Sequence, residues 1–356
     1  MELNLTSLRH EIDRLDNALL QTLQKRLEVS RLVIKFKREQ NVNLNVPSRE
    51  QEILDSLKGR ERSLLSAEVI EDVYKTIFRE SKRLQSESKP LVAFQGEHGA
   101  FSEVAARRWN PEVAPIPCQT IGDVFKGIEV GSYDYGIVPV ENTVGGMMSQ
   151  VNAHLLDSNL YIVGAVEMSV EHAVLIVPGT DFHDIRRVYS QQEALTECQK
   201  FITRMKWEPV PYSDTAGAAK MLAETWEEGS VAIASELAAR YYNLEVLKSG
   251  IADAQNTRTR FLVLARKPLD CGGNRCSITF ITPNRPGALF SVMKMFAEEN
   301  INLTRVASIP TEHGNYVFFL DFAASNEEPR VQRILNQISC ESESYRYLGC
   351  YTETER

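Results

Sequence analysis

The sequence lacks the features that mark membrane, secreted and nucleic-acid-binding proteins. No apolar run in its 356 residues approaches the roughly 18 residues that a membrane-spanning helix needs. The start, Met1 to Asn4, has no basic stretch followed by an apolar one, so a secretory leader is not indicated. Lys and Arg number 40 against 48 Asp and Glu, without a basic tail, which argues against a nucleic-acid partner. We therefore expect a cytoplasmic protein.

Cysteine is scarce and is not arranged for metal binding or disulfides. Six cysteines stand at positions 118, 198, 271, 276, 340 and 350. They form no C-x-x-C pair and have no histidine at zinc spacing, so we expect reduced thiols and no metal site. The motif G-x-G-x-x-G is also absent, which argues against a dinucleotide-dependent dehydrogenase. We expect no cofactor.

The chain is too long for one ordinary hydrophobic core. A prior of about 100–200 residues per domain suggests two or three domains. Its composition, 43% hydrophobic and 25% charged, is that of a globular protein. Polar stretches at 86–90 and 271–274 are typical of linkers. We expect domains at residues 1–88, 89–268 and 275–356.

The first segment predicts an all-helical module. Leucine and isoleucine recur at three- and four-residue steps from Leu8 to Leu27, and the pattern continues to about Lys37 without Gly or Pro. One amphipathic helix of about 33 residues is roughly 50 Å long. A small domain cannot cover such a helix alone, so we expect a dimer that buries its apolar stripe. Further helices are expected at 47–59 and from about 63 to 85.

Several polar side chains of this segment share a helix face or stand at a helix start. Arg26 and Lys37 are eleven residues apart, which is three helical turns, and so they share one face of the first helix. Arg49-Glu50 opens the second helix, and Ser81 stands four residues before Gln85 on the third. Taken singly, each is most simply a solvated surface group. Taken together, these residues are harder to explain as solvated surface groups.

These positions resemble the all-helical chorismate mutase family. The matching motifs are L-R-x-x-I-D-x-L-D at 8–16, K-R at 25–26, Lys37, R-E at 49–50 and S-x-x-x-Q at 81–85. The resemblance covers the whole segment and implies conversion of chorismate to prephenate. One position differs, because the family usually has Asp four residues before the Glu, where this chain has Val46.

The resemblance also implies roles for individual residues. The pocket residues that it implies are Arg9, Arg26, Lys37, Arg49, Glu50, Ser81 and Gln85. Arg9, from the partner protomer, and Arg26 would hold the two carboxylates of chorismate. Lys37 and Gln85 would donate to the ether oxygen, and Glu50 would accept from the ring hydroxyl. A Claisen rearrangement needs no nucleophile; it needs a folded conformer of the dianion and donors at the oxygen where negative charge builds.

The middle segment alternates between strand and helix patterns. The expected strands are 91–94, 136–138, 188–189, 210–212 and 231–233, and the helices after them begin at Ser102, about Gly146, Ser190, Asp214 and Ser235. This alternation predicts an α/β fold. Several of these helices start with a hydroxyl or carboxylate cap beside exposed backbone N–H groups, which suits a carboxylate ligand, although each cap alone is more simply structural.

A polar stretch followed by an apolar run marks the end of this segment. Thr257 to Phe261 precedes the run 262–265, which is typical of a buried strand. Thr259 and Arg260 therefore stand where loop becomes strand, at the mouth of a sheet, a position where α/β folds often bind ligands. The simpler interpretation is a polar strand start with a surface arginine.

Three stretches together resemble prephenate dehydratase and its relative arogenate dehydratase, over some 180 residues. They are G-E-H-G-A-F-S at 96–102, V-P-V-E-N-T at 138–143 followed by Gly145-Gly146, and T-R-F at 259–261. The resemblance implies two α/β lobes around a cleft, similar to type 2 periplasmic binding proteins. Some positions, such as Ala100 and Gln191, differ from the family pattern, which leaves the choice between prephenate and arogenate open.

By this resemblance Thr259 is the catalytic hydroxyl near the departing C4 hydroxyl, and Arg260 is a carboxylate ligand or a support. The cleft-lining residues that it implies are Ser102, Glu141, Asn142, Thr143 and Thr215. A Thr hydroxyl is too weak an acid to protonate a leaving group by itself, so we expect it to act as a positioned hydrogen-bond donor. Glu141 is a rival candidate for the acid.

The last segment has the order strand 277–281, helix 288–298, strand 302–308, strand 316–322, helix 329–338 and strand 345–350. This βαββαβ order, with N-R-P-G-A-L at 284–289, resembles an ACT domain. Dehydratases of the family bind phenylalanine there, which implies an effector site at Gly287, Ala288, Leu289 and Ser308. The family's E-S-R-P motif reads A-S-I-P here, with Ala307 and Ile309 in place of the charged residues. A structural dimerisation module is the alternative.

The sequence thus predicts a bifunctional chorismate mutase and prephenate dehydratase of the phenylalanine pathway, with chorismate and prephenate as substrates and phenylalanine as a candidate effector. Arogenate as the main dehydratase substrate is one alternative. A non-catalytic amino-acid-binding protein is another, since fold does not fix function.

Overall fold

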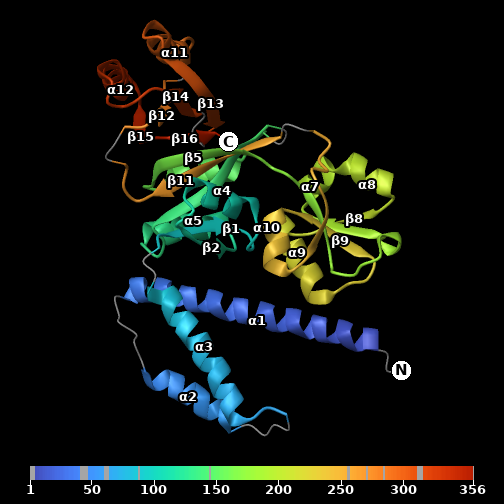
Figure 1. Ribbon diagram of the computed structural model, residues 1–356. Helices are drawn as coiled ribbons and strands as arrows, with labels where there is room; N and C mark the ends of the chain where they lie inside the picture. The colour runs from blue at the N-terminus through green and yellow to red at the C-terminus, as the bar shows by residue number, and fades with distance from the viewer. Residues whose placement is uncertain are drawn as a thin grey trace.

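The structure, a computed structural model, describes residues 5–40, 47–59, 64–86, 89–143, 146–254, 257–269, 272–283, 285–310 and 316–355. A helical part, an α/β part of two lobes and a C-terminal α+β part follow one another along the chain (Figure 1). This order confirms the predicted fold class. The limits of the domains stay a prediction.

The helical part consists of α1 (Leu5–Gln40), α2 (Pro47–Lys58) and α3 (Ala67–Ser86). The single long first helix is confirmed, and α2 starts at the proline and ends before the glycine that predicted its bounds. The third helix begins later than predicted. Ser66 accepts a hydrogen bond from the backbone N–H of Val69 (3.3 Å) and so caps a helix that opens at Ala67.

Helix α1 extends past α3 and lies beneath both α/β lobes (Figure 1). Lys25 pairs with Glu224 of the second lobe, and Glu28 lies 3.7 Å from His98 of the first. The first half of the apolar stripe that predicted the helix is left uncovered. Its members Leu8, Ile12, Leu15 and Leu19 keep 46–60% of their surface exposed.

The first lobe is built on a mixed sheet with the strand order β16-β5-β11-β3-β1-β2, and β4 pairs with β3. The strands are β1 (Leu91–Gln95), β2 (Ala114–Cys118), β3 (Tyr135–Asn142), β4 (Gly146–Met147), β5 (Tyr161–Ser169), β11 (Arg258–Ala265) and β16 (Glu353–Glu355). Helix α4 (Phe101–Trp109) packs on one face, and α5 (Ile121–Glu129) and α6 (Ser149–Asp157) pack on the other.

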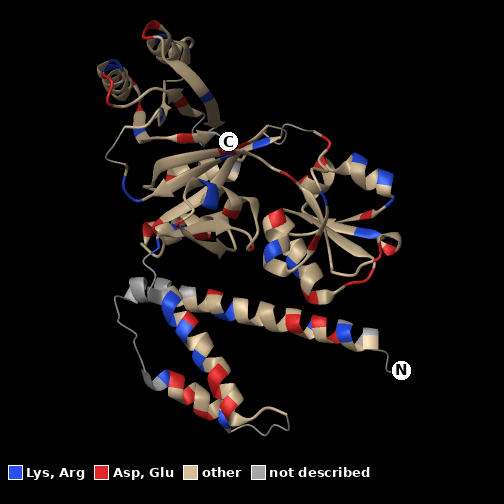
Figure 2. Ribbon diagram, viewed as in Figure 1, with Lys and Arg blue, Asp and Glu red and all other residues tan. Residues whose placement is uncertain are grey.

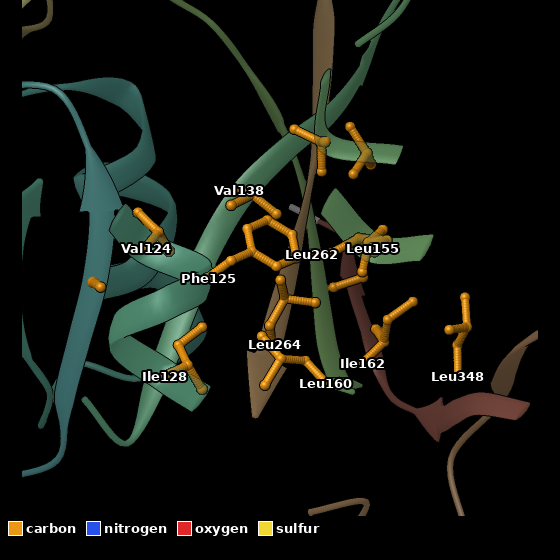
Figure 3. Packing of buried hydrophobic residues seen from close by; sticks show 14 of the residues in the cluster. Val124, Phe125, Ile128, Val138, Leu155, Leu160, Ile162, Leu262, Leu264 and Leu348 are labelled. Atoms are coloured by element: carbon orange, nitrogen blue, oxygen red, sulfur yellow. The ribbon is translucent and has the colours of Figure 1, made fainter. Parts of the chain in front are cut away.

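Alternation along β11 assigns its side chains to these two faces. Leu262 and Leu264 meet Phe125 and Ile128 of α5 (Figure 3). Phe261 and the other odd-numbered residues face α4 instead. Thr259 and Arg260 consequently point to opposite sides of the sheet.

The second lobe has the strand order β10-β6-β9-β7-β8. Its elements are β6 (Ala173–Ile176), the 3₁₀ helix η1 (Phe182–Asp184), β7 (Arg187–Ser190), α7 (Gln192–Glu197), α8 (Gln199–Met205), β8 (Glu208–Pro211), α9 (Thr215–Thr225), β9 (Ser230–Ala234), α10 (Glu236–Tyr242) and β10 (Glu245–Ser249). The chain enters this lobe after β5 and returns to the first lobe before β11.

The C-terminal part has the predicted βαββαβ order. Its elements are β12 (Arg275–Ile281), α11 (Ala288–Glu298), β13 (Asn302–Pro310), β14 (Tyr316–Ala323), α12 (Pro329–Glu341) and β15 (Ser344–Tyr351). Helices α11 and α12 cover one face of its sheet, whose order is β13-β14-β12-β15. The other face packs on the first lobe through Ala307, Phe319 and Leu348.

The last strand, β16, was not predicted. It leaves the C-terminal part and pairs in parallel with β5 of the first lobe. The first lobe therefore contains a strand from the far end of the chain.

Some helix starts in the α/β part were wrong. The helix expected from about Gly146 begins at Ser149, because Gly146 has a φ of +74° and enters the short strand β4. Ser102 was expected to cap its helix, but Ala100 is the first residue before α4 and Ser102 lies in the first turn.

Ser190 was also expected to open a helix. Its hydroxyl instead donates to the carbonyl of Ile233 (2.6 Å) at the end of β7. The caps at Asp214 and Ser235 are confirmed, since their side chains accept from backbone N–H groups of α9 and α10.

Two further features of the described parts are the distribution of their charges and the hydropathy of their helices. Figure 2 shows Lys and Arg intermixed with Asp and Glu over α1, α3 and both lobes. Among the residues that the structure describes, no helix has the length and apolarity needed to cross a membrane.

Candidate active sites

A cleft of about 950 Å³ lies between the two α/β lobes. The ends of β1, β3 and β11 and the first turn of α4 line it from the first lobe. Residues at the starts of α7 and α9 line it from the second. The predicted residues on its wall are Ser102, Asn142, Thr215 and Thr259.

Thr259 is buried at the base of this cleft, with 4% of its surface exposed. Asn142 lies opposite it on β3, and the Asn142 Nδ2 donates to Thr259 Oγ1 (3.3 Å). Because the Thr259 oxygen accepts this bond, its own O–H is free to donate to another group. The structure thus gives Thr259 the geometry of a donor.

Ser102 and Thr215 stand in the first turns of α4 and α9, which approach the cleft from opposite lobes. The positive ends of helix dipoles favour carboxylate groups. Asp214, which caps α9 by accepting from Gly217 N (2.7 Å), lines the same wall. Burial, partly offset by the backbone bond from Gly217, raises the pKa of Asp214.

Other predicted residues lie away from the cleft wall. Glu141 pairs in register with Arg260, so both project from the face of the sheet opposite Thr259. Thr143 is exposed, and its hydroxyl accepts from the backbone N–H of Arg258 (3.0 Å), where it holds β3 against β11. Successive residues of a strand point to opposite faces of the sheet. Glu141 and Arg260 therefore lie on the other face from Asn142 and Thr259, their neighbours in the same motifs.

The side chain of Arg260 is held by the C-terminal part. It pairs with Asp321 of β14 and Glu353 of β16, and it donates to the hydroxyl of Tyr351 (3.0 Å). Ser277 donates to the second oxygen of Asp321 (2.6 Å). Of the two roles predicted for Arg260, this geometry favours the support over the carboxylate ligand.

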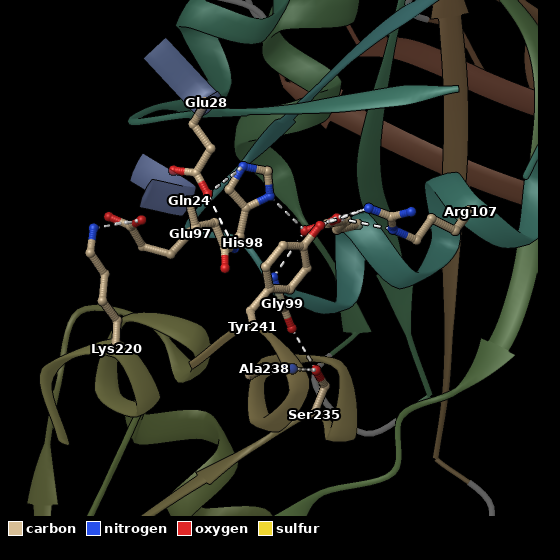
Figure 4. A network of polar contacts seen from close by, with 11 residues as sticks. Gln24, Glu28, Glu97, His98, Gly99, Arg107, Lys220, Ser235, Ala238 and Tyr241 are labelled. Atoms are coloured by element: carbon tan, nitrogen blue, oxygen red, sulfur yellow. Dashed lines mark hydrogen bonds and ion pairs between the residues drawn. The ribbon is translucent and has the colours of Figure 1, made fainter. Parts of the chain in front are cut away.

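A buried polar network joins the two lobes (Figure 4). Glu103 of α4 is fully buried and accepts from Tyr241 of α10 (2.6 Å), Arg107 (2.7 Å) and the backbone N–H of Gly99 (2.9 Å). His98 lies 3.0 Å from the same carboxylate. Burial alone would raise the pKa of Glu103, but these partners outweigh it and lower the pKa to about 2.

Gly99 lets the lobes approach closely at this point. Its φ is +90°, and a Cβ there would stand 2.5 Å from the backbone of Ala238. Ser235 of the second lobe donates to the carbonyl of Gly99. The glycine in the predicted motif at 96–102 is thus needed for packing between the lobes.

The mutase residues gather partly between α1 and α3. The guanidinium of Arg26 donates to Ser81 Oγ (2.8 Å) and lies over the ring of Phe78, 5.4 Å from its centroid. Ser81 is buried. Phe78 also lines a cavity of about 450 Å³ between α2 and α3, together with Glu50.

Glu50 forms an ion pair with Lys82 of α3 (2.8 Å) on this cavity. The motifs did not single out Lys82, although it lies one residue after Ser81. Arg49 points outward, where it pairs with Glu52 (2.9 Å). The side chains of Lys37 and Gln85, and Val46, lie outside the described residues.

Arg9 is exposed near the start of α1. It stands 17 positions before Arg26 on the same helix, which is about 25 Å at the rise of an α-helix. Arg9 therefore cannot reach the Arg26 pocket of its own chain.

The effector residues predicted in the C-terminal part lie at the start of α11 and on β13. Gly287 takes a φ of +82° directly before Ala288 and Leu289, and Ser308 is exposed on β13. Ala307 and Ile309 point to the other side of β13 and pack on the first-lobe core. Apolar residues at these positions suit a buried contact between domains.

Comparisons with known proteins agree with this arrangement. The family model for prephenate dehydratase matches residues 92–269, that for chorismate mutase type II matches 8–86, and that for the ACT domain matches 277–340. The chain belongs to the prephenate dehydratase family. Its three matched domains follow in the order mutase, dehydratase and ACT.

Relatives of this prephenate dehydratase chain include bifunctional enzymes. The bifunctional chorismate mutase/prephenate dehydratase of Aquifex aeolicus is 32% identical and covers 98% of this chain and 97% of its own. The arogenate dehydratase/prephenate dehydratase 2 of Arabidopsis thaliana is 35% identical and covers 82% of this chain and 83% of its own. A solved prephenate dehydratase of Arthrobacter aurescens, in complex with L-Phe, has a TM-score of 0.67 at 28% identity over 74% of this chain and 89% of its own.

The chain is therefore a bifunctional enzyme that converts chorismate to prephenate and prephenate to phenylpyruvate, as the motifs predicted. The alternative of a non-catalytic binding protein is set aside, because both catalytic domains are matched.

Proposed function

We propose that the cleft between the lobes is the dehydratase site and that Thr259 donates a hydrogen bond to the departing C4 hydroxyl of prephenate. The observation that carries this proposal is the bond from Asn142 to Thr259, which leaves the Thr259 proton for the substrate. Ser102 and Thr215 stand where helix dipoles favour the substrate carboxylates. The ring becomes aromatic as carbon dioxide and water leave, so the protein mainly orients the substrate and eases departure of the oxygen.

We propose further that the mutase site lies around Arg26, Ser81 and Glu50. Arg26 holds one carboxylate of chorismate, and Glu50 accepts from its ring hydroxyl. Lys37 and Gln85 supply donors to the ether oxygen. Lys82, paired with Glu50, adds positive charge beside the dianion and orients the Glu50 carboxylate.

The mutase site is completed by a second copy of the chain in this proposal. Support comes from Arg9, which is too far from Arg26 to act in its own chain, and from the uncovered stripe that includes Leu15 and Leu19. Leu15→Asp places a charge in this stripe. We expect it to lower the oligomer mass in analytical ultracentrifugation and to abolish mutase activity; an unchanged mass would contradict the proposed interface.

Phenylalanine is the proposed effector of the ACT domain, at Gly287 to Leu289 and Ser308. The relative from Arthrobacter aurescens was solved with L-Phe. Ala307 and Ile309 face the first lobe, so the site relies on the backbone at Gly287 and the hydroxyl of Ser308. Saturating phenylalanine should change the dehydratase rate or the oligomer mass, and a lack of both effects would refute the role.

Arogenate is a second candidate substrate, favoured by the charge of the cleft. Its described lining carries the carboxylates of Glu97, Glu193, Glu197 and Asp214, and no Lys or Arg. Glu97 is paired with Lys220 and Glu197 lies against His172, so Glu193 and Asp214 are the carboxylates that suit the ammonium group that arogenate has and prephenate lacks. Competition between the two substrates at equal concentration decides which has the higher kcat/KM.

We also propose the cytoplasm as the compartment. Cys276 and Cys350 face each other across β12 and β15 and are free thiols, which suits a reducing environment. Fractionation of cells that produce the chain tests this placement.

A further inference from the structure

A histidine and a glutamate that the motifs did not single out lie together on the dehydratase cleft. His172 belongs to the segment between β5 and β6, where the chain passes from the first lobe to the second. Glu197 is the last residue of α7. Both residues line the cavity that Thr259 lines. The pair is thus on the same cavity as the proposed reaction centre, at the junction of the lobes.

His172 is held in one orientation. Its Nε2 lies 2.9 Å from Oε2 of Glu197, and its ring stands at right angles to that of Phe101, with the centroids 5.3 Å apart. Only 3% of His172 is exposed. Because a carboxylate accepts, Nε2 carries the proton in this contact. Within the described ranges the Nδ1 atom is itself buried and has no hydrogen-bond partner, so it is the ring nitrogen whose hydrogen-bonding capacity the fold does not use.

His172 differs from the other described lining side chains in the charge that it can carry. The described lining holds four carboxylates, of Glu97, Glu193, Glu197 and Asp214, and lacks Lys and Arg. His172 is the described lining side chain that can become a cation. Glu197, in contact with it, stabilises the imidazolium in the way that a carboxylate orients and charges a catalytic histidine.

The dehydration reaction consumes a proton. The bond between ring carbon C1 and its carboxylate breaks, and its electron pair makes the ring aromatic as carbon dioxide leaves. The C4–O bond breaks with its pair on oxygen, and this oxygen needs one proton to leave as water. Thr259 can donate a hydrogen bond, but its hydroxyl is too weak an acid to supply that proton.

We propose that His172 is the general acid of the dehydratase reaction, with Glu197 as its positioning residue. The imidazolium gives its Nδ1 proton to the departing C4 oxygen, directly or through the hydroxyl of Thr259, and is reprotonated from solvent between turnovers. The same step serves prephenate and arogenate, which share the C1 carboxylate and the C4 hydroxyl. This inference rests on the proposed dehydratase site.

The test uses the full chain with prephenate and with chorismate. His172→Gln keeps a donor for Glu197 but has no proton to give. We expect a loss of about a hundredfold or more in the dehydratase kcat, with a small change in KM and an unchanged mutase rate. Added imidazole should restore part of the rate of His172→Gly. His183→Gln, at an exposed histidine of η1, is the matched control and should keep full activity.

Glu197→Gln separates a catalytic role from a structural one. It removes the charge that stabilises the imidazolium, so the alkaline fall of kcat should move to lower pH while the chain stays folded. A dehydratase kcat within about threefold of wild type in His172→Gln would overturn the proposal. Failure of imidazole to rescue His172→Gly would overturn it as well. An inactive wild-type chain would instead contradict the dehydratase assignment, so the two failures are distinguishable.

Discussion

Thr259 and Arg260 are neighbours in the chain, yet their side chains serve different parts of the molecule. Thr259 faces the cleft and accepts from Asn142, whereas Arg260 faces the ACT domain and pairs with Asp321. The alternation of a strand gives two neighbouring residues of a single motif different surroundings. A motif therefore identifies a strand position more surely than it identifies the role of each residue.

Thr259→Val keeps the shape of the side chain and removes the hydroxyl. We expect the dehydratase kcat to fall by about a hundredfold or more, because the donor at the leaving oxygen is lost. The mutase rate should stay the same, since its residues lie on α1, α2 and α3. Thr259→Ser, which keeps the hydroxyl, is the control and should retain most of the activity. Equal losses in both variants would show that the methyl group matters and the hydroxyl does not.

Arg26→Ala tests the mutase pocket in the same way. The guanidinium is half-buried against Ser81 and Phe78, so its pairing with a substrate carboxylate is partly shielded from water. We expect the mutase kcat/KM to fall by about a hundredfold or more, with the dehydratase rate on prephenate unchanged. Arg14→Ala removes an exposed arginine of the same helix and should have little effect. A normal mutase rate in Arg26→Ala would place the site elsewhere.

Residues of the site were predictable where a motif fixed a chemical group on the correct face. Ser102, Asn142, Thr215 and Thr259 were predicted and lie on the cleft wall. His172 and Glu197 were not predicted, because they meet only in the folded structure and no spacing in the sequence relates them.

At the scale of elements, β11 links the cleft between the lobes to the ACT domain. The strand carries Thr259 on one face and Arg260 on the other, and the partners of Arg260 come from β14 and β16. The ACT domain is therefore joined by buried charges to the strand that carries Thr259. A shift of the ACT sheet would displace the side chain of Arg260 and so move β11.

Arg260→Gln should destabilise the lobes strongly. It takes the close arginine away from Asp321, whose side chain is only 3% exposed, and, among the described residues, leaves Glu353 paired with Arg275 alone. Loss of a partner from a buried ion pair costs about 3–5 kcal/mol. Urea unfolding followed by tryptophan fluorescence reports on this region, because Trp109, Trp207 and Trp226 all lie in the two lobes.

Arg258→Gln is the matched control for that measurement. Arg258 lies on the same strand, but its side chain is 49% exposed and pairs with Glu167 at 3.6 Å. Exposed pairs contribute about 0–1 kcal/mol. Similar urea midpoints for the two variants would contradict the structural role of Arg260.

The network around Glu103 predicts a pH dependence of stability. Its folded pKa of about 2 lies below the ordinary value of 4.5, so the carboxylate stabilises the fold above the unfolded pKa, and this contribution is lost as pH falls from about 4.5 toward 2. A shift of this size corresponds to roughly 3 kcal/mol. The difference in urea midpoint between wild type and Glu103→Gln should shrink as pH falls through this range. Glu112→Gln, at an exposed site, should show no such trend.

At the scale of the whole molecule, the order of domains was predictable because each carries its own periodicity. The 3.6-residue repeat of α1, the strand and helix alternation after residue 89, and the βαββαβ order after 275 are local signals. Strand β16 was missed, because its three residues give no pattern and only pairing with β5 makes them a strand. The docking of α1 beneath both lobes was also not predictable, since it depends on isolated pairs such as Lys25 with Glu224.

The most direct test of the account is to give the purified chain chorismate alone and to follow the products over time. We predict transient prephenate followed by phenylpyruvate, because both sites are present in one chain. Accumulation of prephenate without phenylpyruvate would contradict the dehydratase site proposed around Thr259 for that substrate and would favour arogenate. Unchanged chorismate would contradict the mutase site.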